Sequence, residues 1–183
     1  MARHIYHCPL RWSDMDAFGH VNNVVFVRYL EEARIDFMFR LARADGSPSF
    51  SGGSVVARHE IDYLKPLFHR HEPVVIETWV TQITAATVTL TYEIKDGEAP
   101  GAALDGDAGT RSGSGTLYAR ASTVVVPYDL TAQRPRRLTA EERAFLERFR
   151  DDDGPSGPGS GARQGSTTTV QRGRSPQSGA LVT

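Results

Sequence analysis

Apolar residues recur along this chain with two periods, one typical of a helix and one typical of strands. From about Asn23 an apolar residue returns every third or fourth position, which predicts an amphipathic helix of about five turns. Asn22 or Asn23 is suited to cap this helix, because a short amide accepts hydrogen bonds from the free N–H groups of the first turn. The apolar stripe comprises Phe26, Leu30, Ala33, Phe37 and Leu41, and the polar side mainly Glu31, Arg34 and Arg40; Gly46 and Pro48 end the helix.

Strand-like segments surround the predicted helix. The clearest covers residues 87–94, where Val88, Leu90, Tyr92 and Ile94 alternate with polar residues and therefore share one face. Four further segments have a strand pattern, and a capping box predicts a short helix near the end. These elements are the strands 5–12, 55–64, 74–83 and 116–126, the last broken by Pro127, and the helix that follows Thr139 and Glu142.

The order of these elements predicts the fold class. One long helix between a first strand and four later strands indicates an α+β fold, in which a five-stranded antiparallel sheet wraps around a central helix. The glycine-rich segment 95–115 is expected to be a long hairpin loop. Residues 151–183 contain 19 Gly, Pro, Ser or Thr among 33 residues and no aromatic residue, so burial cannot offset their chain entropy. We expect one domain over residues 1–150 and a disordered tail over 151–183.

Composition and charge exclude several classes of function. The 183 residues include 21 Lys and Arg against 22 Asp and Glu, so the chain lacks the basic field of a nucleic-acid-binding protein. A single cysteine, Cys8, excludes a disulfide framework and a cysteine-rich zinc site. No segment approaches the roughly 20 apolar residues of a membrane span, and the start of the chain does not resemble a signal peptide. We expect a cytoplasmic protein with no membrane partner.

A polar turn between the first strand and the helix is the candidate site. A helix N-terminus presents unpaired N–H groups, so a carboxylate facing it could attack a carbonyl group or activate water. The alternative is a turn whose side chains only cap the backbone. A metal site is a third interpretation, but the spacing matches no established metal motif and we expect no metal. The turn contains Asp14, Asp16, Gly19, His20, Asn22 and Asn23.

Three segments of the chain together resemble a known family. RWSDMDAFGHVNNVVFVRYLEEARIDF is similar to the opening of hotdog-fold acyl-CoA thioesterases of the 4-hydroxybenzoyl-CoA thioesterase type, and RHEIDYLKPLFHRHEPVVIETWV and RPRRLTAEERAFLERF resemble later parts of that family. The resemblance covers about residues 3–149. It implies the hotdog fold, hydrolysis of an acyl-CoA to a carboxylic acid and coenzyme A without a cofactor, and a homodimer or dimer of dimers with sites between subunits.

The resemblance also implies roles for individual residues. Asp16 matches the catalytic carboxylate, and the backbone N–H of Asn23 would polarise the thioester carbonyl. Thr87 matches a substrate-contacting position. The residues expected to orient the turn are Asp14, Gly19, His20 and Asn22.

Other positions are less closely defined by the pattern. His59 shares a strand face with Ile61 and is either a satisfied core or interface histidine or part of the substrate pocket. Glu60 is a rival for the catalytic carboxylate. Some family members grip the nucleotide phosphates with a basic cluster, which here is replaced by the uncharged residues 84–87. The candidates to replace it are Arg134, Arg136 and Arg137, or Arg70 with His69 and His71.

Other functions remain open on the sequence. A non-catalytic hotdog module could bind acyl-CoA as a sensor, and an appended DNA-binding segment would favour it. A hotdog dehydratase would need a His–Asp pair in a hydratase motif, which the turn at residues 14–23 does not resemble. The carrier could also be acyl carrier protein instead of coenzyme A, and the pattern does not indicate the acyl group.

Overall fold

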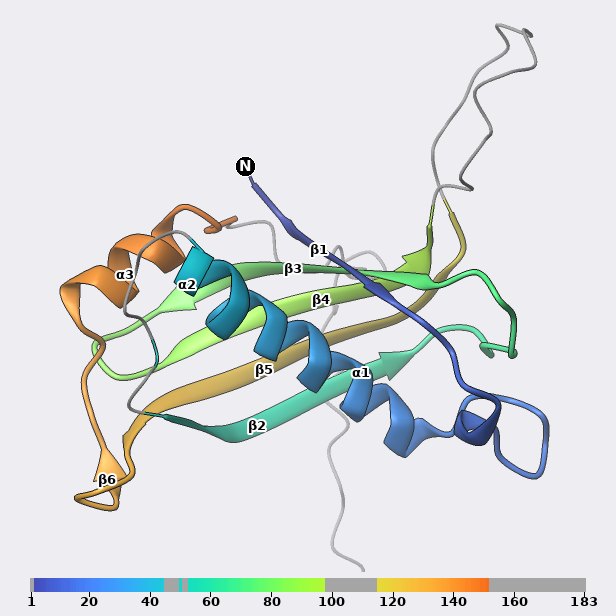
Figure 1. Ribbon diagram of the computed structural model, residues 1–183, viewed down its shortest axis with the longest axis horizontal. Helices are drawn as coiled ribbons and strands as arrows, with labels where there is room; N and C mark the ends of the chain where they lie inside the picture. The colour runs from blue at the N-terminus through green and yellow to red at the C-terminus, as the bar shows by residue number, and fades with distance from the viewer. Residues whose placement is uncertain (1, 45–49, 51–52, 98–114, 152–183) are drawn as a thin grey trace, which may run out of the picture.

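The computed structural model describes residues 2–44, 50, 53–97 and 115–151. In this part of the chain one curled antiparallel sheet carries a long helix across one face, which confirms the predicted α+β hotdog arrangement (Figure 1). Most of the expected loop and, apart from Asp151, all of the expected tail lie outside the described residues.

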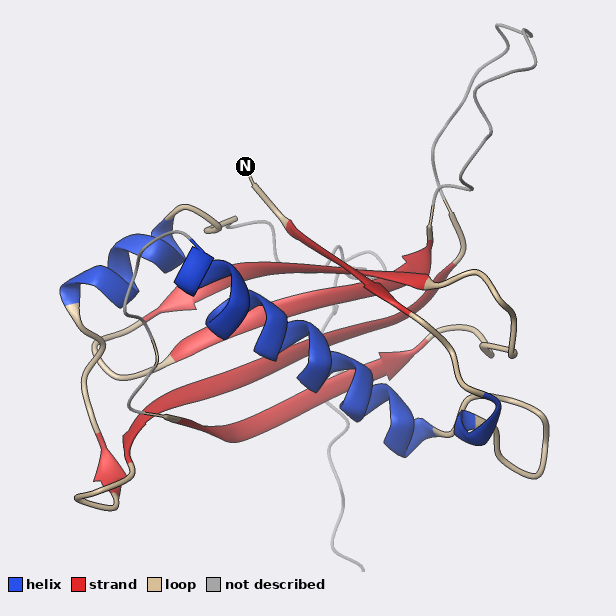
Figure 2. Ribbon diagram, viewed as in Figure 1, coloured by secondary structure: helices blue, strands red, loops and turns tan. Residues whose placement is uncertain are grey.

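The sheet is antiparallel throughout, with the strand order β1-β3-β4-β5-β2 (Figure 2). The five predicted strands are confirmed, and a two-residue strand that the sequence did not predict, β6, pairs with the end of β5. β1 and β2 are the two edges, and they lie on opposite sides of the helix (Figure 1). The strands are β1 (His4–Cys8), β2 (Ser54–Tyr63), β3 (Val74–Ile83), β4 (Val88–Asp96), β5 (Leu117–Asp129) and β6 (Arg134–Pro135).

Two strand boundaries differ from the sequence pattern. β1 ends at Cys8, not at residue 12, because the chain turns into a short 3-10 helix, η1 (Trp12–Asp14). β5 continues through Pro127. The N–H of Tyr128 donates to Gly53 on the β2 side, so position 127 faces the other side, beyond the last β4–β5 pair at Val125. A proline is tolerated there because the ladder with β4 has ended and its contact with Arg136, directly after β6, is made by the Pro127 carbonyl as an acceptor.

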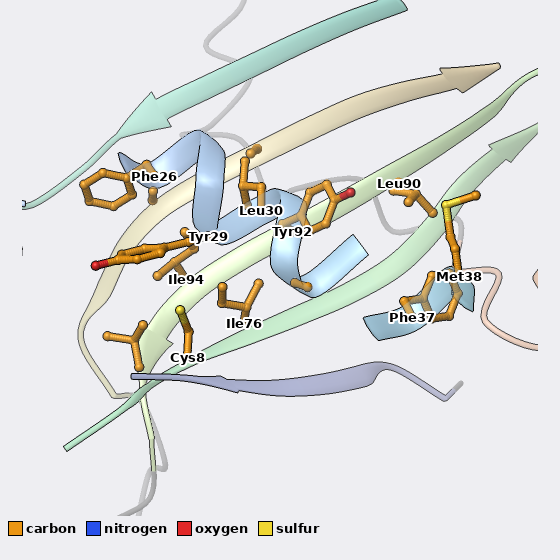
Figure 3. Packing of buried hydrophobic residues seen from close by; sticks show 14 of the residues in the cluster. Cys8, Phe26, Tyr29, Leu30, Phe37, Met38, Ile76, Leu90, Tyr92 and Ile94 are labelled. Atoms are coloured by element: carbon orange, nitrogen blue, oxygen red, sulfur yellow. The ribbon is translucent and has the colours of Figure 1, made fainter. Parts of the chain in front are cut away.

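The predicted long helix forms as one continuous run of three pieces. α1 (Asn23–Ile35) leads into a π-helical turn, η2 (Asp36–Leu41), and then into α2 (Ala42–Ala44). Its apolar stripe is buried as expected, except that Leu41 is half-buried, and Figure 3 shows Leu30 packed beside Tyr92 of β4. The alternation in β4 is also confirmed, because Val88, Leu90, Tyr92 and Ile94 are all buried.

The prediction for Arg34 is wrong. The sequence interpretation placed it on the polar side of the helix, but only 9% of its surface is exposed. Position 34 lies four residues after Leu30, which is fully buried, and residues four apart share one face of a helix. The spacing therefore carries the charged side chain beneath the sheet.

The C-terminal helix α3 (Ala140–Glu147) closes one end of the core. Its predicted capping box is confirmed, with Thr139 and Glu142 each bonded to the other's backbone N–H. The buried Glu142 carboxylate also accepts two hydrogen bonds from Arg136, at 2.8 and 2.6 Å, and one from the N–H of Phe50 at 3.1 Å. Burial opposes ionisation of Glu142, but these hydrogen bonds outweigh it and lower its pKa.

Replacing this carboxylate should therefore weaken the fold in a pH-dependent way. Glu142→Gln is expected to lower the free energy of unfolding by about 2 kcal/mol at pH 7, because charge-assisted hydrogen bonds are lost. A pKa lowered by folding stabilises the folded state above the unfolded-state pKa of about 4.3, and this contribution is lost as the pH falls. Urea unfolding should show the two proteins converging below about pH 4. Glu141→Gln, at the exposed neighbouring position, is the control. An equal loss in both variants would contradict the prediction.

Candidate active site

Asp14 anchors the polar turn to the long helix. Its Oδ2 accepts a hydrogen bond of 2.6 Å from the hydroxyl of Tyr29 and one of 2.9 Å from the N–H of Arg11. Its backbone oxygen accepts a bond from the N–H of Asn22. Asp14 is only 2% exposed, and burial together with Asp14 raises the pKa of the Tyr29 hydroxyl. This carboxylate is therefore a structural anchor that holds the turn against α1.

Asp16 lies at the surface end of the same turn and is arranged differently. Its Oδ1 accepts hydrogen bonds from the N–H groups of Phe18, at 2.8 Å, and His20, at 3.2 Å. In the described part of the chain Oδ2 has no hydrogen-bond partner. Gly19 closes the turn with a φ of +76°, a left-handed conformation that favours glycine. The turn thus fixes one carboxylate oxygen and leaves the other available for chemistry.

The N-terminus of α1 supplies hydrogen-bond donors beside this carboxylate. Asn22 is the cap, because its side chain accepts from the N–H of Val24 and its carbonyl from that of Val25. The N–H of Asn23, the first residue of the helix, has no acceptor within the helix and lies at the positive end of the helix dipole. The carbonyl of Asn23 accepts a hydrogen bond of 3.2 Å from the hydroxyl of Tyr63.

A cavity of about 340 Å³ brings these groups together. Asp16, His20 and Asn23, which the sequence analysis placed in one candidate turn, all line it. The ring of His20 packs against that of Phe68, with 4.8 Å between the centroids, so His20 supports one wall. The remaining lining comes from the polar turn, from α1, and from the end of β2 with the turn after it: Val21, Phe26, Tyr63, Leu64, Lys65, Pro66 and Leu67.

Lys65 and Tyr63 are pocket residues that the sequence analysis did not single out. Both come from the segment DYLKP, where a strand ends at a proline, and the only available signal was a cation directly after that strand end. Their nearness to Asp16 depends on the packing of β2 beside α1. Lys65 is exposed and brings a positive charge to the pocket mouth.

The structure does not bring Thr87 or His59 to Asp16 within one chain. Thr87 closes the β3–β4 turn, with its hydroxyl 2.7 Å from that of Thr84, at the opposite end of the sheet from η1 (Figure 1). His59 lies on β2 with its Nδ1 2.9 Å from the hydroxyl of Thr123. Burial and the nearby Arg34 lower the pKa of His59.

The candidate phosphate-binding arginines are partly committed to other contacts. Arg70 lies 2.6 Å from a carboxylate oxygen of Asp96, and Arg136 is held by Glu142. The rival carboxylate Glu60 is exposed, and it contacts Arg58 and Ser122 on the sheet face away from α1. Arg134 and Arg137 are exposed, and the rings of His69 and His71 contact each other near Trp12.

Two further kinds of site are absent from the described residues. They contain no group of three or more His, Cys, Asp or Glu side chains placed to hold a metal ion. None of their helices is long and apolar enough to span a membrane. The arrangement that remains is a carboxylate with an available oxygen and the first residue of a helix in the lining of one small pocket, which suits chemistry at a polarised carbonyl group.

Comparison with known proteins finds a family match and a curated relative. Residues 10–149 match the thioesterase-like superfamily. The uncharacterized protein YsmA of Bacillus subtilis (strain 168) is 32% identical over 83 residues, which are 45% of this chain and 54% of YsmA, so this chain spans about half of that curated relative.

Solved structures share the fold. A predicted thioesterase from Bacillus stearothermophilus superposes with a TM-score of 0.66 at 23% identity, over 84% of this chain and 100% of its own. A thioesterase from Thermus thermophilus, solved with coenzyme A and Zn, superposes with a TM-score of 0.59 at 24% identity, over 82% of this chain and 95% of its own. The PA2801 protein of Pseudomonas aeruginosa superposes with a TM-score of 0.57 at 26% identity, over 77% of this chain and 95% of its own.

The two carboxylates of the turn should differ in their effect on stability. Asp14→Asn is expected to lower the free energy of unfolding by about 1–3 kcal/mol, because it disturbs a buried carboxylate that accepts two hydrogen bonds. Asp16→Asn should change it by less than half as much, since an amide oxygen can accept the same two backbone bonds. Thermal unfolding monitored by circular dichroism measures both. Tyr29→Phe should reproduce part of the Asp14 effect. A larger loss for Asp16→Asn would reverse the two assignments.

Proposed function

The chain belongs to the thioesterase-like superfamily, and we propose on that basis that it is an acyl-CoA thioesterase of the 4-hydroxybenzoyl-CoA thioesterase type. It would hydrolyse an acyl-CoA to a carboxylic acid and coenzyme A. The observation that carries the proposal is the available Oδ2 of Asp16 in the pocket that also contains the first residue of α1, Asn23. The related Thermus thermophilus structure, which contains coenzyme A, supports coenzyme A as the carrier.

The chemistry follows from these two groups. The substrate carbonyl oxygen accepts a hydrogen bond from the N–H of Asn23, where the helix dipole stabilises the negative charge that develops on it. The ionised Asp16 then either attacks the carbonyl carbon or removes a proton from an attacking water. The C–S bond breaks, and coenzyme A leaves as the thiolate and takes up a proton. If water attacks, it supplies the hydroxyl of the acid directly; if Asp16 attacks, the acyl group forms an anhydride with its carboxylate, and water then hydrolyses that bond to release the acid and restore Asp16. The Oδ1 bonds from Phe18 and His20 keep Asp16 oriented throughout.

The carrier would approach past Lys65. This exposed ammonium lies at the pocket mouth, whereas Arg70 and Arg136 are paired with carboxylates. A flexible point charge can meet phosphate oxygens without a fixed geometry. We therefore assign the pantetheine–phosphate end of the substrate to the Lys65 side of the pocket and the acyl group to the other side.

We also propose a homodimer, alone or as a dimer of dimers, formed through β2. This ten-residue strand is an edge of the sheet and is uncovered on most of its length. Its apolar residues Val55, Val56 and Tyr63 are each more than a third exposed. A long apolar edge strand pairs readily with another strand, and a second copy satisfies it in a closed two-fold assembly. Across such an interface, Thr87 could still contact a partner's substrate.

Asp16→Asn should separate catalysis from binding. The substitution keeps the size and the two hydrogen bonds but removes the negative charge, so kcat should fall by at least about a hundredfold. KM should change much less, because the carboxylate acts mainly in the transition state. Release of thiol from a panel of acyl-CoAs, followed with a thiol-reactive dye, measures both. Asp14→Asn, assayed well below its melting temperature, should lose at least tenfold less activity. A folded Asp16→Asn protein with near wild-type turnover would exclude the mechanism.

The proposed β2 interface has its own test. Sedimentation should give about twice, or four times, the 20.1 kDa of the chain. Val56→Lys places a charge on the exposed edge and should shift the protein towards monomer, with a parallel loss of activity. Ile5→Lys is the matched control, since Ile5 is exposed on the opposite edge strand, β1. A wild-type monomer with full activity would contradict a site shared between subunits.

A further inference from the structure

One face of α1 and the edge strand β2 border a strip that leads away from the Asp16 pocket, which we name the α1–β2 seam. On the helix, Asn23, Val27 and Arg34 share a face, because they follow one another at spacings of four and seven. On β2, alternate residues face the helix, ending at Tyr63. The nearest backbone neighbours of α1 are β1 and β3, so the β2 side is the less tightly covered. The side chains that face the seam from β2 are His59, Ile61 and Tyr63.

The near end of the seam is the proposed thioester site. The hydroxyl of Tyr63 bonds to the carbonyl of Asn23, and the ring of Tyr63 packs edge-on against Phe26 with 5.3 Å between the centroids. All three residues line the same cavity as Asp16. An acyl group whose carbonyl carbon lies at Asp16 therefore starts at this end.

The middle of the seam is apolar and has a defined length. Val27 and Ile61 are both half-buried, and Ile61 packs against the main core. From Tyr63 to His59 the strand covers about 13 Å at roughly 3.3 Å per residue. From Asn23 to Arg34 the helix covers about 16 Å at roughly 1.5 Å per residue. This is the span of a medium-length acyl chain, and Val27 and Ile61 are placed to contact its methylene groups.

The far end of the seam holds a buried and poorly compensated positive charge. Arg34 is 9% exposed, and its Nη1 has no hydrogen-bond partner among the described residues. Its other terminal nitrogen lies 3.6 Å from Glu31, whose side chain is 56% exposed, so that pair is largely screened by solvent. A buried guanidinium is ordinarily found with a carboxylate, because an unpaired buried charge costs several kcal/mol.

Two other polar side chains near Arg34, those of Tyr92 and His59, are also buried or half-buried. The hydroxyl of Tyr92 is fully buried, and it too has no hydrogen-bond partner in the described part of the chain. Burial raises the pKa of Tyr92 to about 12, although Arg34 and the hydroxyl of Thr123 oppose the rise. Tyr92 is therefore a neutral donor, and His59, with its lowered pKa, is a neutral neighbour at pH 7. Apart from the solvent-exposed carboxylate of Glu31, the groups near Arg34 at this end of the seam are neutral, so none of them balances its charge.

We propose that the far end of the α1–β2 seam binds a carboxylate at the end of the acyl chain, so that the preferred substrates are medium-chain ω-carboxyacyl thioesters. The carboxylate pairs with Arg34, whose planar guanidinium can donate two parallel hydrogen bonds, and also accepts from Tyr92. The methylene chain lies along Val27 and Ile61, and the thioester carbonyl reaches Asn23. Hydrolysis then yields a dicarboxylic acid and coenzyme A. This assignment rests on the proposed thioesterase function and specifies its substrate class.

Substrate preference tests the proposal directly. The wild type should hydrolyse decanedioyl-CoA with a kcat/KM at least about tenfold above that for decanoyl-CoA, since one buried charge pair is worth more than 1.4 kcal/mol. Arg34→Met removes the charge at similar size and should abolish the preference. The loss should lie mainly in KM, because the distant carboxylate is bound equally in the ground and transition states. Arg34→Lys should keep part of the preference. Arg28→Met, at an exposed position on the same helix, should leave it unchanged.

A binding measurement separates this proposal from the proposed function. Calorimetric titration should show decanoate, whose carboxylate can pair with Arg34, binding the wild type at least about tenfold more tightly than 1-decanol, with the difference lost in Arg34→Met. If no acyl-CoA is hydrolysed, the thioesterase function fails and the calorimetry still decides the role of Arg34. If decanoyl-CoA is hydrolysed as well as decanedioyl-CoA, the carboxylate site is overturned and the thioesterase remains.

Two other occupants of the far end would also overturn the proposal. A carboxylate of a second copy would make Arg34→Met dissociate the dimer in sedimentation while the substrate ratio stays that of the wild type. A bound water would leave oligomeric state, substrate ratio and acid binding all unchanged in the variant. If Arg34→Met does not fold, Arg34→Lys and the wild-type preference for decanedioyl-CoA over decanoyl-CoA decide the question, because neither requires that variant.

Discussion

The apolar stripe of α1 that runs through Phe26, Leu30 and Ala33 is buried beneath the curled sheet, and the site is placed by that contact (Figure 3). A helix held along its whole length cannot shift or rotate without exposing large apolar side chains, which costs about 1.5–3 kcal/mol for each one. Its first N–H groups are therefore fixed in space. The turn before it is fixed in the same way through Tyr29, because that residue belongs to the buried part of α1 and holds Asp14.

The two carboxylates of the turn illustrate how environment separates chemical roles. They are two residues apart and each accepts two hydrogen bonds on a single oxygen, but Asp14 is 2% exposed and bonded to the buried hydroxyl of Tyr29, whereas Asp16 is half-buried, is held only by backbone N–H groups and lines the pocket. A buried carboxylate bonded to a buried hydroxyl stabilises the fold, and one in the wall of a pocket can react. The same short motif thus contains both the support and the proposed reactive group.

Local pattern predicted much of this architecture, and the misses have physical causes. The sequence predicts the alternation in β4, the stripe on α1 and the capping box at Thr139, because each depends on residues close in sequence. Arg34 was assigned to the polar side of the helix because it is charged, although its spacing of four residues from Leu30 places it on the buried side. Lys65 was overlooked, and Arg70 was taken as available for phosphate, because the nearness of Lys65 to Asp16 and the pairing of Arg70 with Asp96 exist only after the sheet has formed.

Phe50 is a single described residue between two parts of the chain that the structure leaves undescribed. It is buried, it has a φ of +59°, and its N–H donates to the clamped carboxylate of Glu142. The N–H of Gly53 donates back to the carbonyl of Phe50 at 3.0 Å, one residue before β2 begins. Through Phe50, the clamped carboxylate of Glu142 therefore holds the point at which the chain enters β2, so the capped helix α3 helps to set where the edge strand starts.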